Sequence, residues 1–420
     1  MLGPLNIPLE EFGVSSSTGF LPDQLPLWRL TNAYYDSWET ILHRLPSLLR
    51  QHRLRCEVDA LPTLSTSRLV AENEWQRAYL VLSFLTHAYI WGGESPSERL
   101  PAAISIPFLE VSSHLGLPAT ATYSALNLWN FTAPPNSDLS QVDNLSVLHT
   151  FTGSEDEAWF YLISVAIEAR GAEIIRTMLK AMDAVRADDA YTVGKCLLKF
   201  ADTLPEIAAI LDRMYEKCDP EVFYHKIRPF LAGSKNMGSA GLPSGVFYEE
   251  GDREGQWRQY SGGSNAQSSL IQFFDIVLGV EHSPTKNSKV VEVDLKAKHG
   301  FLLEMRKYMP GNHRSFLQRI ESAANIRDYV KTSACTEDVT AAYNLAVARF
   351  TAFRDVHIQI VTRYIILPSR KMPPTQSSGL NLAVASTMKK SSDGLSGTGG
   401  TELLPFLKQG RDETIQTVLP

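Results

Sequence analysis

The sequence predicts an all-α fold with a small N-terminal helical domain and a larger C-terminal helical domain. From residue 155 onward, apolar residues recur at the three-and-four spacing of amphipathic helices. Strand patterns are scarce, and only the short stretch 290–293 has a β-like composition. The chain of 420 residues is also long enough for a large core and more than one domain.

The N-terminal third of the chain combines an extended arm with helical stretches. Residues 1–25 are rich in Pro, Gly and Ser, which is typical of an extended arm. Helical patterns follow at residues 28–53 (broken near Pro46), 67–89 and, in short pieces between prolines, 101–130. The polar connection 131–153 predicts a boundary between a small domain, 1–135, and a large domain, 136–420.

The large domain is expected to consist almost entirely of helices. We expect them at residues 155–186, 190–217, 219–232, 264–280, 295–309, 311–333 and 336–367. Residues 368–400 are rich in Ser, Gly, Pro and Lys, which predicts a mobile loop. A last amphipathic helix is expected at 401–418.

Composition excludes several classes of function. A formal net charge of −6 provides no general basic field for nucleic acid or an anionic membrane. No run of about 18 apolar residues could span a bilayer, and the first residues do not resemble a secretory signal. The four cysteines are far apart, as in reduced intracellular thiols, so we expect a cytoplasmic protein.

His357 is the strongest candidate for a functional residue. It lies on an apolar helical stripe, with Phe353 four residues before it and Ile360 three after it. A histidine in this setting is most often a core residue bonded to a backbone carbonyl. An imidazole on an apolar wall, with Arg354 and Arg363 near its edge, would also suit a haem and its propionates. The residues of this helix leave both interpretations open.

Three further segments carry side chains that could join such a site. Phe160 and Ser164 lie one helical turn apart, which suits either a pocket wall or ordinary core packing. Arg228 lies among apolar residues and, if buried, requires either a substrate carboxylate or a structural acid. Gly263 allows close approach of the backbone to a ligand or a tight turn, and Ser264 could cap the following helix.

No catalytic signature of the common hydrolases or kinases is present. The Gly-rich stretch 397–400 has neither a preceding strand nor a lysine, so it is not a phosphate-binding loop. The remaining histidines do not form a spaced set of metal ligands. From the residues alone, the sequence predicts a helical protein with one candidate haem ligand.

Six segments in order resemble the indoleamine 2,3-dioxygenase family. They are IPFLEVSSHLGLPATATYSALNLWNF (106–131), FYHKIRPFLAGS (223–234), YSGGSNAQSSLIQFFDIVLGV (260–280), MRKYMPGNHRSFL (305–317), RDVHIQIVTRYII (354–366) and GTGGTELLPFLKQGRDET (397–414). The resemblance runs from about residue 25 to the C-terminus and is that of a fungal-type member. It implies a helical fold that encloses haem b and inserts both atoms of O2 across the indole C2–C3 bond of L-tryptophan. The product would be N-formylkynurenine, the first intermediate of the kynurenine pathway.

The resemblance also implies a role for each candidate residue. On the haem side, His357 matches the iron ligand, Asp275 a carboxylate behind that histidine, Arg354 a residue near a propionate, and Gly263 and Ser264 the backbone over the haem edge. On the substrate side, Phe160 and Phe223 match aromatic residues that pack on the indole, and Ser164 matches a hydroxyl near the substrate. Arg228 matches the arginine that binds the substrate carboxylate. Tyr123 matches a residue of the pocket wall, Ser264 a substrate contact, and Thr398 the threonine of the mobile loop. Of these, Ser164, Phe223 and Arg228 are the expected catalytic group.

We expect no histidine, acid or lysine on the substrate side, so placement by the protein and chemistry by the cofactor would carry the reaction. Three positions depart from mammalian members of the family: Leu126 replaces a cysteine, Asn265 an alanine and Ser234 a tryptophan. The alternative function is a haem-binding sensor, or a paralogue of low activity with a different indole ligand. The family leads us to expect a monomer.

Overall fold

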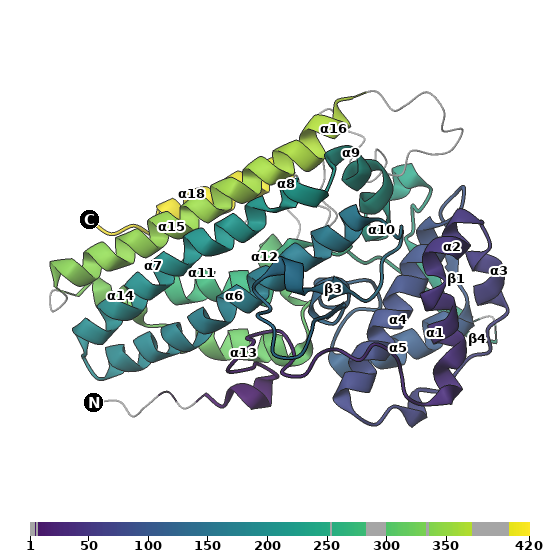
Figure 1. Ribbon diagram of the computed structural model, residues 1–420, viewed down its shortest axis with the longest axis horizontal. Coiled ribbons are helices and arrows are strands. Elements are labelled where there is room, and N and C mark those ends of the chain that lie inside the picture. The colour runs from purple at the N-terminus through teal and green to yellow at the C-terminus, as the bar shows by residue number, and fades with distance from the viewer. Residues whose placement is uncertain (1–4, 6, 253, 283–299, 333–335, 372–402) are drawn as a thin grey trace, which may run out of the picture.

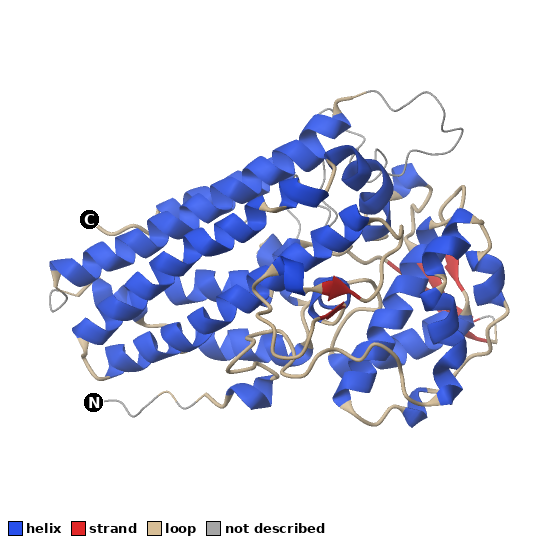
Figure 2. Ribbon diagram, in the orientation of Figure 1, coloured by secondary structure: helices blue, strands red, loops and turns tan. Residues whose placement is uncertain are grey.

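The computed structural model describes residues 5, 7–252, 254–282, 300–332, 336–371 and 403–420. The all-α prediction is confirmed, because helices dominate and the strands are few and short (Figure 2). The stretch 290–293, most of the expected loop 368–400, and Thr398 lie outside the described residues. No helix among the described residues is long and apolar enough to cross a membrane.

Short helices gather at one end of the molecule, around two longer ones (Figure 1). They are α1 (Asp36–His43), α2 (Leu45–Arg50), α3 (Leu54–Asp59), α4 (Glu72–Trp91) and α5 (Ala102–Leu115). Helices α1 and α2 are separate at Arg44, just before Pro46, as the proline predicts. The N-terminal arm crosses to the other end, where Phe20 contacts the rings of His313 and Phe316.

The rest of the molecule is built on three long helices that pack side by side: α6 (Glu155–Arg186), α7 (Ala190–Asp212) and α15 (Glu337–Val361) (Figure 1). The shorter ones are α8 (Met214–Lys217), α9 (Pro220–Val222), α10 (Arg228–Leu231), α11 (Ser269–Leu278), α12 (Phe301–Arg306), α13 (Gly311–Glu321), α14 (Ile326–Val330), α16 (Leu367–Ser369) and α18 (Leu403–Ile415). Helix α18 lies along α15. The side chain of Ser154 caps α6 by accepting from the backbone N–H of Glu157 at 3.2 Å.

Several of the expected helices are interrupted by π-helical turns or breaks. The stretch expected at 219–232 contains α9, a π-helical turn at Phe223–Ile227 and α10. The stretch expected at 336–367 ends in a π-helical turn at Thr362–Ile366, and the stretch 311–333 divides into α13 and α14. A further π-helical turn occupies Ser124–Leu128. Such turns insert one residue into the helical repeat and often accompany functional sites.

The structure also contains a small β-sheet, which the sequence did not predict. Strands β4 (Val246–Gly251) and β5 (Glu254–Arg258) form an antiparallel hairpin, and β1 (Arg99–Leu100) joins β4 in parallel. A second pair joins β2 (Phe131–Thr132) to β3 (Ser146–Val147). The hairpin escaped prediction because these strands are short and rich in Glu and Gly, which are uncommon in strands.

One buried hydrophobic cluster includes residues from both expected domains. It extends from the N-terminal arm through α4 and α5 to α6, α7 and α15. The domain boundary near residue 135 therefore remains a prediction.

Candidate functional site

An apolar cavity lies where α6, α10, α11, α15 and α18 meet, and it collects the predicted site residues. The ten of these that the structure describes all line it: Tyr123, Phe160, Ser164, Phe223, Arg228, Gly263, Ser264, Asp275, Arg354 and His357. Leu126 and Asn265 line it as well, whereas Ser234 is not among its lining residues. Each described π-helical turn also contributes to the wall, through Leu126, Phe223 and Tyr364.

His357 faces this cavity from α15. Its ring makes no hydrogen bond to any other residue in the part of the chain that the structure describes, so it is not a core histidine bonded to a carbonyl. Burial, together with the nearby charge of Arg354, lowers its pKa to about 4. The ring is therefore neutral at physiological pH, with a nitrogen lone pair available to a metal.

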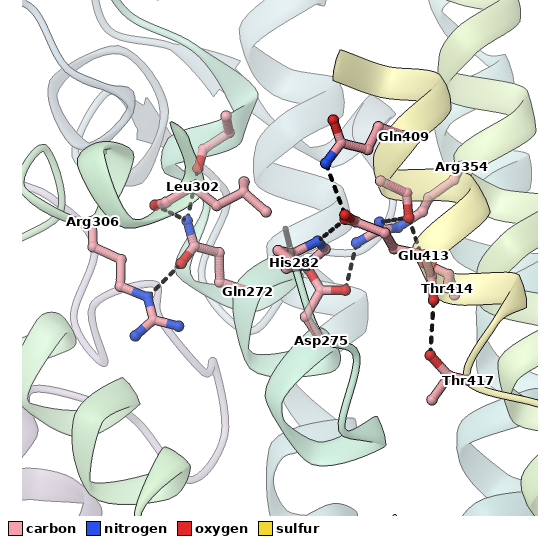
Figure 3. A network of polar contacts seen from close by, with 12 residues as sticks. Gln272, Asp275, His282, Leu302, Arg306, Arg354, Gln409, Glu413, Thr414 and Thr417 are labelled. Carbon is pink, nitrogen blue, oxygen red and sulfur yellow. Dashed lines mark hydrogen bonds and ion pairs between the residues drawn. The ribbon is translucent and has the colours of Figure 1, made fainter. Parts of the chain in front are cut away.

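A network of ion pairs next to the cavity joins α11, α15 and α18 (Figure 3). Arg354 donates from Nη2 to Oδ1 of Asp275 at 2.5 Å and from Nη1 to the carbonyl of Gly410. His282 lies between Asp275 and Glu413, with N–O distances of 3.2 and 2.7 Å. We call Asp275, His282, Arg354 and Glu413 the ion-pair cluster.

The ion-pair cluster balances its own charges. Although burial raises the pKa of Asp275, the charges of Arg354 and His282 hold it below its usual range. Burial lowers the pKa of His282, but its contacts with Asp275 and Glu413 outweigh this and raise the pKa above the ordinary value. The carboxylate of Asp275 contacts Arg354 and His282, and its expected place behind His357 remains a prediction.

Another part of the cavity wall is aromatic. The rings of Phe160 and Phe223 lie 4.9 Å apart at an angle of 57°, and Phe223 meets Tyr364 edge-on at 5.7 Å. Phe160 and Ser164 share one face of α6, as their spacing predicts. A flat aromatic ligand could pack against this wall.

The π-helical turn at Phe223–Ile227 explains how Phe223 and Arg228 reach the same cavity. The backbone N–H of Arg228 donates to the carbonyl of Phe223, five residues earlier, so the two residues lie on one side of the turn. Arg228 is fully buried, and its guanidinium lies 5.7 Å from the ring of Tyr224. Burial lowers its pKa to about 10, so it remains a cation at neutral pH.

The backbone at Gly262 and Gly263 passes very close to other segments of the cavity wall. A Cβ on Gly262 would lie 2.0 Å from the carbonyl oxygen of Leu231, and one on Gly263 would lie 2.6 Å from a methyl group of Leu126. Only glycine fits this approach without movement of the wall. Ser264 then caps a short 3₁₀ turn by accepting from the N–H of Ala266.

Sequence reasoning missed two titratable residues near the cavity. Glu168 is buried behind Tyr123, one turn after Ser164, and the signal for it was an acid inside an apolar helical stripe. His282 gave no sequence signal, because its partner Glu413 is 131 residues away. Among the described lining residues, Asp275 is the one acid, and it pairs with Arg354.

The sequence profile of the family described as "Indoleamine 2,3-dioxygenase" matches residues 8–417. The chain belongs to this family. It is 43% identical to indoleamine 2,3-dioxygenase nanC of Aspergillus nanangensis, covering 100% of this chain and 99% of the relative. It is 43% identical to the indoleamine 2,3-dioxygenase of Saccharomyces cerevisiae, covering 97% and 93%. It is 40% identical to 6-hydroxytryptophan 2,3-dioxygenase fscD of Fusarium equiseti, covering 98% of each chain.

Membership of this family makes the protein an oxidoreductase of the dioxygenase class, in a family that depends on haem. Within the described residues, no three His, Cys, Asp or Glu side chains gather as a site for a bare metal ion. A single neutral imidazole on an apolar wall is instead the donor set that suits an iron already held by a macrocycle.

Proposed function

We propose that the protein inserts both atoms of O2 across the indole C2–C3 bond of L-tryptophan to give N-formylkynurenine. The observation that carries this proposal is the placement of two groups in one apolar cavity. The His357 ring has no hydrogen bond within the described residues, and the Arg228 cation is fully buried. The first suits a haem iron, and the second suits the carboxylate of an amino acid.

The residues present fit a haem. His357 would bind the iron, the close-packed Gly263 and Ser264 would cover the edge of the macrocycle, and Arg354 would lie near a propionate. When bound, the haem supplies the redox chemistry that activates O2. Arg354 already bonds Asp275, so the ion-pair cluster would fix its guanidinium in place before the haem arrives.

The remaining residues would place the substrate. Arg228 would bind the carboxylate, and the anion would offset the cost of burying the guanidinium. The indole would pack on Phe160 and Phe223, and the apolar wall would exclude water. Ser164 would offer a hydroxyl inside the cavity, and no acid among the described residues lines this wall. Binding and orientation are therefore the tasks of this wall.

A second candidate substrate is a ring-hydroxylated tryptophan. Asn265 lines the cavity, and its side-chain amide makes no hydrogen bond within the described part of the chain. Such an amide could bond a hydroxyl on the indole ring. The relative from Fusarium equiseti is named for 6-hydroxytryptophan. A haem-binding sensor without turnover is the remaining alternative.

The deciding experiment supplies the haem-reconstituted, reduced protein with O2 and either L-tryptophan or 6-hydroxytryptophan. We expect N-formylkynurenine from L-tryptophan, and we expect His357→Ala to lose both the haem spectrum and the product. Tight haem retention by His357→Ala would contradict the ligand assignment. A normal haem spectrum with no product from L-tryptophan would favour the second substrate or the sensor. The cytoplasmic location and the monomeric state remain predictions.

A further inference from the structure

Glu168 is a buried acid whose place in the molecule the proposed reaction does not explain. It lies on α6, one turn after Ser164, and is 1% exposed. It does not line the cavity but stands directly behind a residue that does, Tyr123. A buried carboxyl group costs free energy unless its contacts compensate for the loss of water.

Both hydrogen bonds that the Glu168 side chain makes within the described part of the chain are accepted by one oxygen, Oε1. Tyr123 donates from its hydroxyl to Oε1 at 3.0 Å, and Ser268 donates from Oγ to the same atom at 2.7 Å. Oε2 makes no hydrogen bond within the described part of the chain. The two donors are thus anchored at one point, while the second oxygen is left to carry either a charge or a proton.

These two donors belong to two different walls of the cavity. The backbone N–H of Tyr123 donates to Gln267 at 2.9 Å, and Tyr123 leads into the π-helical turn Ser124–Leu128 that carries Leu126. Ser268 caps α11 by accepting from the N–H of Ile271, directly after the segment that contains Ser264. Glu168 therefore joins α6 to two segments of the cavity wall, one at Tyr123 and one at Ser268.

We propose that Glu168 is a positioning residue for substrate binding, whose negative charge holds Tyr123 and Ser268 and thereby sets the spacing of the cavity walls. This inference rests on the proposed function, because it concerns the same cavity and the same substrate. Bonds from a hydroxyl to a carboxylate are stronger than bonds to a neutral acid, so protonation of Glu168 loosens both anchors together.

The charge of Glu168 changes within the physiological range. Burial raises its pKa to about 7, and the hydrogen bonds from Ser268 and Tyr123 oppose that rise. Tyr123 is the titratable group that contacts it, and burial and the adjacent Glu168 raise the pKa of Tyr123 well above its usual value. Tyr123 therefore stays neutral while Glu168 titrates. The affinity for substrate should be higher above about pH 7 than below it.

The test compares the haem-loaded wild type with Glu168→Gln, which preserves the volume and the acceptor oxygen but removes the charge. Affinity for L-tryptophan is read from the change in the haem spectrum, and KM and kcat from turnover, between about pH 5.5 and pH 8.5. We expect Glu168→Gln to raise KM about tenfold at high pH, to lose the pH step in affinity, and to change kcat less. Glu173→Gln is the matched control, because Glu173 lies on the outer side of the same helix and pairs with Arg170.

Tyr123→Phe provides a second test from the opposite side of the contact. If Tyr123 acts through its hydrogen bond to Glu168, the double variant should bind L-tryptophan no more weakly than Glu168→Gln alone. Additive losses, or an unchanged pH step in Glu168→Gln, would overturn the positioning role. Failure of the proposed function is seen separately, as absence of product from a wild type that still shows the spectral change with L-tryptophan. Absence of that spectral change in the wild type would overturn both proposals.

Discussion

The two sides of the cavity satisfy their charges in different ways. Beside His357, the ion-pair cluster binds every charge to another residue of the chain, so this side is complete before any ligand arrives. Elsewhere in the cavity, Arg228 is fully buried, and burial lowers the pKa of its guanidinium to about 10. In the proposed function, the ion-pair cluster would hold the cofactor side in place, and Arg228 would present its cation to the substrate carboxylate.

The largest expected effect tests the substrate side. Arg228→Ala should lower kcat/KM for L-tryptophan on the order of 100-fold, because a hydrogen-bonded charge contact with the carboxylate contributes about 2–3 kcal/mol. Steady-state turnover measures this loss, and the haem spectrum should stay normal. Arg363→Ala is the control, since Arg363 stacks on Tyr215 and does not line the cavity. Equal losses in both variants would show that the effect is not specific to the carboxylate.

A substitution on the haem side should reduce turnover less than Arg228→Ala does, but should reduce stability more. Asp275→Asn removes the partner of two cations in a nearly buried cluster and should lower the free energy of unfolding by about 3 kcal/mol. Denaturant unfolding measures the change. Asp355→Asn breaks the more exposed pair with Arg411 and should cost about 1 kcal/mol or less. Similar costs for the two variants would contradict the distinction between a buried cluster and a surface pair.

The smallest effect concerns the pH dependence of the ion-pair cluster. Since Asp275 and Glu413 raise the pKa of His282, its contribution to stability is complete below the ordinary value of 6.5 and disappears as the pH rises through the raised value. Thermal unfolding of wild type and His282→Gln should therefore differ by about 1 kcal/mol at low pH and converge at high pH. A difference that grows with pH would reverse the assigned sign.

Part of this site follows from the sequence. Phe160 and Ser164 share a helical face through their spacing, and the apolar stripe around His357 places the ring on a buried wall. The role of each residue came from the resemblance to a family rather than from periodicity. Where the chain follows a regular helix, the sequence was therefore a good guide to which residues meet.

The rest depended on contacts that no local pattern encodes. The π-helical turn at Phe223–Ile227 places Phe223 and Arg228 on one side, which an α-helical pattern with its 3.6-residue repeat does not predict. The contacts of Asp275 with Arg354 and His282 join residues that are distant in sequence. Glu168 bonds Tyr123 and Ser268, which lie 45 and 100 residues away from it along the chain. Such polar contacts are set by tertiary packing.

The most direct test of the account compares the affinities of L-tryptophan and tryptamine, which lacks the carboxylate. Each ligand is titrated into the haem-loaded wild type and into Arg228→Ala, with the haem spectrum as the signal. We expect the wild type to bind L-tryptophan about 30-fold or more tightly than tryptamine, and Arg228→Ala to bind both alike. A wild type that binds the two ligands equally would contradict the proposal that Arg228 binds the substrate carboxylate.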